Sequence, residues 1–205
     1  MQMLKRYKWT WILLAVIIIM AGYLIYTSSG IGKSKLPVIG QVEDFSLENV
    51  DGKTITRDDT KGKVRLFYFF YTSCPDVCPV TTFLLSQTQK QLIKDGTFAK
   101  DAEFVSISFD PKVDTREKIK EFADKFYVDY NGWYFLRGDD KKIRDIAEKS
   151  FKIGIMGDNK DNFAHSNVIA LVDRDNNVRK LYNANDTDNV TAESLAKDVE
   201  DLAKK

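Results

Sequence analysis

The spacing of apolar residues differs from one segment of the chain to the next, and each spacing predicts either a strand or a helix. Residues 64–71 are apolar and aromatic with one interruption, Arg65, which is typical of a central strand covered on both faces. Residues 115–127 repeat apolar positions at helical spacing, and Thr115 is a favourable N-cap. The same reasoning predicts strands at 103–109, 133–136, 168–172 and 178–182, and helices at 139–150 and 191–203.

Two further signals complete the expected order of elements. Residues 42–47 and 54–56 flank Asp51-Gly52, which is a hairpin turn signal. A helix is expected to open at Cys74-Pro75 and to reach about Lys94, with Pro75 at its first position, where a missing N–H is tolerated. A hairpin, a β-α-β-α-β series, and a second hairpin with a helix together predict an α/β or α+β domain around a mixed sheet.

An uncharged, largely apolar run from 9 to 32 precedes this domain and follows the basic residues Lys5, Arg6 and Lys8. A membrane span needs about 20 apolar residues, so the run predicts a transmembrane helix. The basic start predicts a cytoplasmic N-terminus and a single-pass protein of the cell membrane, with its domain on the extracytoplasmic side. A cleaved signal peptide is the alternative, and the length of the run favours an anchor. The expected parts are a basic tail (1–8), an anchor (9–27), a linker (28–36) and a soluble domain (37–205).

Composition narrows the chemistry. The net charge is only +1, which gives no support for a nucleic-acid partner. The chain contains two cysteines, Cys74 and Cys78, and a single histidine, His165. Any site that uses sulfur and imidazole therefore draws on these three residues.

The two cysteines are four residues apart, so both sulfurs face the same side if Cys78 lies in the first turn of the helix. Amides at a helix N-terminus favour thiolates, which metal binding and thiol exchange both require. A purely structural disulfide would close a very small loop and would stabilise the fold little. The spacing alone leaves two hypotheses open, a metal-binding pair and a redox-active pair.

His165 precedes the strand at 168–172, in a predicted loop that can face the cysteine loop. Two thiolates and one imidazole suit a soft or borderline metal, and copper fits as Cu(I) or as Cu(II). Zinc in a structural site usually takes a fourth protein ligand, and iron–sulfur clusters need more cysteines. Copper is therefore the preferred metal.

Two motifs and their order resemble the Sco/SenC family. They are FYTSCPDVCP at 70–79 and SFDPKVDT at 108–115, followed by FAHS at 163–166, within a match over about 42–182. The resemblance implies a thioredoxin-like fold, a mixed central sheet flanked by helices, and a copper ion held by Cys74, Cys78 and His165. It also implies a metallochaperone rather than an enzyme, which matures the dinuclear copper centre of cytochrome c oxidase. The expected partner is subunit II of that oxidase or a related copper acceptor.

The alternative function is a thiol–disulfide oxidoreductase that reduces the cysteines of the oxidase copper site. Cys74 and Cys78 would then be a redox-active pair that does not require His165. A peroxiredoxin-type peroxidase is disfavoured, because the Thr-x-x-Cys element expected before its cysteine is absent at Cys74. Asp110 and Asp114 fit a turn and a helix start, which explains them without a functional role. The alternative is that they support the site or dock a partner.

Overall fold

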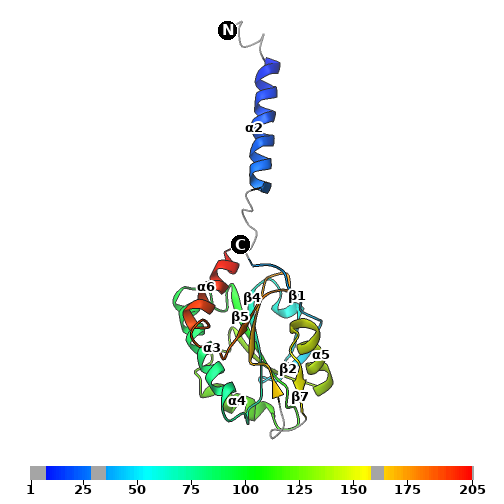
Figure 1. The fold of residues 1–205 in the computed structure, drawn as a ribbon, viewed down its shortest axis with the longest axis vertical. Helices are drawn as coiled ribbons and strands as arrows, with labels where there is room; N and C mark the ends of the chain where they lie inside the picture. The colour runs from blue at the N-terminus through cyan, green and yellow to red at the C-terminus, as the bar shows by residue number, and fades with distance from the viewer. Residues whose placement is uncertain (1–7, 29–35, 158–163, 205) are drawn as a thin grey trace. The chain divides into compact units, whose positions relative to one another are not determined.

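The computed structural model describes residues 8–28, 36–157 and 164–204, without the side chains of 8, 24–28, 164 and 165. It divides into two compact units, Met1–Lys35 with Lys205, and Leu36–Lys204 (Figure 1). The described part of the first unit is helix α2 (Lys8–Ser28). Among the described residues, no helix is both long enough and apolar enough to cross a membrane. The structure therefore does not confirm the predicted transmembrane anchor.

The second unit is built on a mixed eight-stranded sheet of order β1-β10-β9-β4-β5-β6-β2-β3. Strands β4, β5 and β6 are parallel, and β9 pairs antiparallel with β4. The strands are β1 (Gly40–Gln41), β2 (Ser46–Asn49), β3 (Thr54–Thr56), β4 (Val64–Phe70), β5 (Ala102–Ser108), β6 (Trp133–Arg137), β9 (Val168–Val172) and β10 (Asn177–Asn183). The predicted mixed sheet, including its central strand, is confirmed.

Among the residues that the structure describes, four helices flank this sheet: α3 (Val77–Lys94), α4 (Arg116–Asp124), α5 (Asp140–Phe151) and α6 (Ala192–Ala203). Helices α3 and α6 pack together on one side of the sheet, and α5 lies on the other (Figure 1). The predicted cap at Thr115 is confirmed, because its side chain accepts a hydrogen bond from the Lys118 amide. Thr191 caps α6 in the same way by accepting a hydrogen bond from the Ser194 amide. Helix starts are thus well marked in the sequence.

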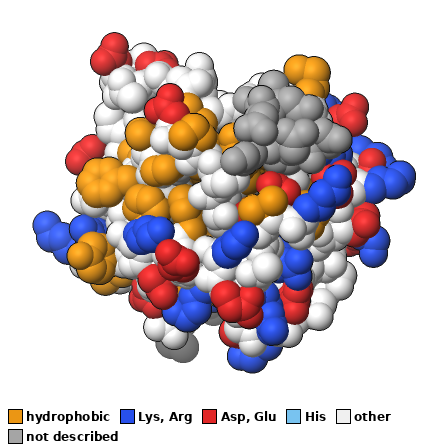
Figure 2. Space-filling view, turned by 90° about the horizontal axis from the view of Figure 1, so that it is seen from below, with side chains coloured by type: hydrophobic (Ala, Val, Ile, Leu, Met, Phe, Trp, Pro, Cys, Tyr) orange, Lys and Arg blue, Asp and Glu red, His pale blue; other side chains and the backbone are white. Residues whose placement is uncertain are grey.

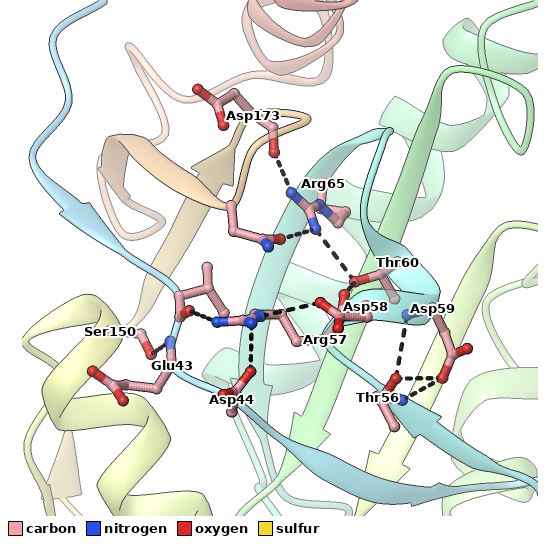
Figure 3. Close-up of polar contacts among 12 residues, drawn as sticks. Glu43, Asp44, Thr56, Arg57, Asp58, Asp59, Thr60, Arg65, Ser150 and Asp173 are labelled. Carbon is pink, nitrogen blue, oxygen red and sulfur yellow. Dashed lines mark hydrogen bonds and ion pairs between the residues drawn. The ribbon is translucent and has the colours of Figure 1, made fainter.

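The interruption in the apolar run, Arg65, is fully buried and ties the start of β4 to its neighbours (Figure 3). Its guanidinium donates to Asn176 Oδ1 at 2.6 Å and to the carbonyl of Asp173, both in the turn between β9 and β10. A third, longer bond reaches Thr60 Oγ1 at 3.4 Å. A buried charge is tolerated where it is hydrogen-bonded in this way. This cluster secures the end of β4 opposite to the cysteines.

Three local expectations are wrong. Helix α3 begins at Val77 with Asp76 at its N-cap, so Pro75 precedes the helix instead of opening it. The reason is a turn in which the Cys74 amide donates to the Tyr71 carbonyl, 3.3 Å away. Helix α4 ends at Asp124, before Tyr127, whose positive φ of 55° breaks the helical path. Finally, His165 lies in a two-residue strand, β8 (Ala164–His165), paired with β7 (Ile155–Met156), and not in a loop.

Candidate metal and thiol site

The cysteine loop lies where two parallel strands end side by side. Phe70, the last residue of β4, is in register with Ser108, the last residue of β5. Cys74 follows β4, and Cys78 is the second residue of α3, within its first turn as predicted. In open α/β sheets, sites gather beyond the carboxyl ends of strands. The two cysteines therefore lie at the edge of the sheet where sites commonly form, while the site itself stays a prediction.

The two cysteines are reduced and close together. Neither forms a disulfide, and Cys78 is fully buried, whereas 7% of Cys74 is exposed. The Cys78 amide donates to Cys74 Sγ across 3.4 Å. This amide belongs to the free N-terminus of α3, where N–H groups lack helical partners and stabilise negative charge. The geometry therefore favours a thiolate at Cys74.

The two thiols have opposite acidities. The hydrogen bond from Cys78 lowers the pKa of Cys74 to about 5, and the amides of Asp76 and Cys78 act in the same direction against burial. That same hydrogen bond, together with burial, raises the pKa of Cys78 far above its ordinary value. At neutral pH the pair consequently holds one thiolate, at Cys74, and one protonated thiol, at Cys78.

Two tyrosines of the aromatic run border this pair, although the run as a whole predicts only core. Tyr68 on β4 is buried, and its hydroxyl has no hydrogen-bond partner among the described residues. Burial and then the neighbouring Cys78 raise the pKa of Tyr68. Burial and then Cys74 raise the pKa of Tyr71 as well. The sequence signal for this role is that the aromatic run contains tyrosine at these two positions, where phenylalanine would fill the core equally well.

Asp114 holds the loop that precedes Cys74. Its fully buried carboxylate accepts hydrogen bonds from the Thr72 amide at 3.0 Å and from the Thr72 and Ser108 hydroxyls at 2.5 Å each. Arg137 Nε donates to the backbone carbonyl of Asp114 at 2.9 Å. These bonds join the cysteine loop to the end of β5. The contacts agree with the alternative in which Asp114 supports the site.

Asp110 is 2% exposed, and its Oδ2 atom has no hydrogen-bond partner in the part of the chain that the structure describes. Burial, followed by the nearby charge of Asp114, raises the pKa of Asp110. Its own backbone accepts from the amides of Val113 and Asp114, which closes the turn predicted from the Asp-Pro pair. Its main observed contribution is thus to this turn.

His165 is held through the backbone of the small hairpin. It pairs with Ile155, and the Arg144 guanidinium donates to the carbonyls of Ile155 and Gly157 at 2.6 and 2.8 Å. Its side chain lies outside the described residues, so the structure does not test the ligand set of Cys74, Cys78 and His165. Among the described side chains, no three histidine, cysteine or carboxylate groups gather as a metal site would require.

The domain is a mixed sheet flanked by helices, and its reduced cysteine pair lies at the start of the helix that follows the central strand. These two features define the class of thioredoxin-like proteins that bind metals or exchange thiols. The SCO1/SenC family model matches residues 38–201, and the chain belongs to this family. It is 31% identical over 179 residues to the SCO1 protein homolog of Bacillus subtilis, covering 86% of this chain and 90% of that relative.

Solved structures agree with this assignment. BsSco, described as a member of the Sco family of cytochrome c oxidase assembly proteins with a disulfide switch, superposes with a TM-score of 0.73 at 30% identity, covering 84% of this chain and 98% of its own. Arabidopsis thaliana ScoI, solved with copper bound, gives a TM-score of 0.66 at 27% identity, covering 80% and 99%. The expected family and the expected thioredoxin-like fold are confirmed.

Proposed function

We propose that this protein is a copper metallochaperone that matures the dinuclear copper centre of cytochrome c oxidase. Copper is its cargo, held by Cys74, Cys78 and His165. The observation that carries the proposal is the reduced, buried cysteine pair with a ready thiolate at Cys74. The copper bound to the related ScoI supports it.

The donor set fits a soft ion. Thiolates select Cu(I), and imidazole is compatible with copper in either oxidation state. Cys74 is the more accessible of the two, with 7% of the residue exposed, whereas Cys78 would supply a second sulfur from the interior after losing its proton. Ligand exchange would therefore begin at Cys74, because this sulfur is the one that another protein can reach.

Copper titration against a competing chelator tests the ligand set. We expect Cys74→Ser, Cys78→Ser and His165→Ala each to weaken copper binding by at least about tenfold, because the loss of a group that only supports a ligand already costs that much. Met156→Ala is the matched control, because Met156 is exposed on the partner strand and pairs with Ala164 instead of His165. Wild-type affinity in His165→Ala, or lost affinity in Met156→Ala, contradicts the three-ligand proposal.

A second function is favoured by the unequal acidities of the two cysteines. The Cys74 thiolate would attack a disulfide of the acceptor, form a mixed disulfide and release one acceptor thiolate. Cys78, after losing its proton, would attack the Cys74 sulfur and release the second acceptor thiolate. Two electrons thereby reduce the acceptor, and a Cys74–Cys78 disulfide remains. Full reduction of an oxidised acceptor peptide by His165→Ala would support this function separately from copper delivery.

The proposal also includes the membrane location expected from the apolar run at 9–27. Tethering would raise the effective concentration of the chaperone at an oxidase in the same membrane. Extraction of membranes at alkaline pH tests this point. The full chain is expected to stay in the membrane pellet, and its release into the supernatant would contradict the anchor.

A further inference from the structure

Helix α3 presents two large apolar side chains to solvent just beyond the cysteine pair. Val80 and Phe83 are each 57% exposed, and their spacing of three residues places them on one face of the helix. Helical rise places them about 3 and 8 Å along the axis from Cys78. Cys78 is buried, so the two apolar side chains lie on the opposite, solvent-facing side of the first turns of α3. Scattered exposed apolar residues are ordinary, but an adjacent pair beside a reactive site indicates binding.

The surroundings of this pair, the α3 patch of Val80 and Phe83, are also unusual. No charged residue occurs from 77 to 89, which covers more than half of α3. The exposed faces of the other helices of this domain carry ion pairs between successive turns: Lys120–Asp124 in α4, Lys141–Asp145 in α5 and Lys197–Asp201 in α6. Figure 2 views the end of the domain near α4 and β7 and shows apolar side chains gathered in one area. The absence of charge is thus local.

The position of the cysteines explains why these apolar side chains are exposed to solvent. Only 7% of Cys74 is exposed, so a ligand atom of another protein reaches its sulfur only if that protein lies over the adjoining loop and the first turns of α3. Even a transient interface buries several hundred Å² on each partner, which extends well beyond one sulfur atom. The α3 patch therefore falls within the area that an acceptor covers.

We propose that the α3 patch is the docking surface for the copper acceptor, and that the acceptor presents its soft metal ligands within an uncharged, apolar surface. This inference rests on the proposed chaperone function and names how its partner is recognised. An anionic membrane or a nucleic acid does not fit, because either would call for Lys or Arg around the site. Charge-poor interface centres with aromatic residues are characteristic of protein partners.

The test compares two double variants of the full chain. Val80→Ser/Phe83→Ser removes the patch without adding charge near Cys74. Val38→Ser/Ile39→Ser is the matched control, because these side chains are 56% and 49% exposed beside β1, which pairs near the Arg65 end of the sheet. Each copper-loaded protein is mixed with the copper-free soluble domain of oxidase subunit II, and the bimolecular transfer rate constant is measured. Transfer to a small chelator is measured in parallel.

We expect the patch variant to transfer copper to the subunit II domain at least about tenfold more slowly than the control, as hot-spot losses do. Transfer to the chelator stays unchanged, because the ligands are intact. Equal rates to the subunit II domain in both variants would overturn the docking inference alone. If the wild type fails to transfer at all, the proposed function falls as well. Concentration-dependent dimers that only the patch variant abolishes would assign the patch to a second copy and also overturn the inference.

Discussion

Asp114 connects the cysteine loop to the sheet through three hydrogen bonds, so its removal gives a measurable loss of stability. In Asp114→Ala the Thr72 amide, the donor of a partly buried hydrogen bond, loses its partner and cannot turn elsewhere, which costs about 1–3 kcal/mol. The hydroxyls of Thr72 and Ser108 lose about 0.5–1.5 kcal/mol each, because they can rotate toward other acceptors. The expected decrease in the free energy of unfolding is therefore roughly 2–6 kcal/mol.

Asp114→Asn separates the hydrogen bonds from the charge. An asparagine oxygen in the place of Oδ2 still accepts from the Thr72 amide and the Ser108 hydroxyl, and its NH₂ group can donate to a rotated Thr72 hydroxyl. Only the charge assistance is lost, about 1 kcal/mol. Urea unfolding of the unit 36–204 measures both variants. A loss below about 1 kcal/mol in Asp114→Ala, or equal losses in the two variants, would refute the account of the loop.

Two further predictions concern the thiols. Because Cys74 is already ionised above pH 5 and Cys78 is still protonated, Cu(I) binding to His165→Ala, which leaves only the two thiols, releases about one proton at neutral pH. The logarithm of the Cu(I) association constant is then expected to rise by about one per pH unit above pH 5 and by about two per pH unit below it. A slope of about two at pH 7 would show that Cys74 is not a thiolate. The Tyr68 hydroxyl has no partner of hydrogen-bond geometry among the described residues, yet its presence beside Cys78 lowers the pKa of that thiol. In Tyr68→Phe the Cys78 thiol should lose its proton less readily, so we expect copper binding about tenfold weaker, as for other groups that support a metal ligand, with little change in the urea midpoint. Unchanged affinity would show that the hydroxyl does not act on the sulfur.

The sequence predicts most strongly the features that depend on near neighbours. The largely apolar run at 64–71, interrupted only by Arg65, predicts the central strand. Thr115 and Thr191 mark helix starts because capping acts within three residues. The bonds from Asp114 to Thr72 connect residues 42 positions apart, and no periodicity reports such a pairing. The strands β7 and β8 have two residues each, too few for an alternating pattern to appear. Motif resemblance located the cysteines, but their unequal acidity required their burial and the amides of α3.

The unequal acidities of Cys74 and Cys78 suit the proposed binding and release of copper. A site of two ready thiolates would hold Cu(I) without competition from protons. In this protein burial and the bond to Cys74 keep Cys78 protonated, so a proton competes with copper for that sulfur at neutral pH. Under the proposed function, an acceptor would withdraw the ion through Cys74, Cys78 would then regain its proton, and this step would favour transfer over return. The same burial that weakens binding would therefore promote delivery, while the hydrogen bonds to Asp114 would keep the loop in place through the exchange.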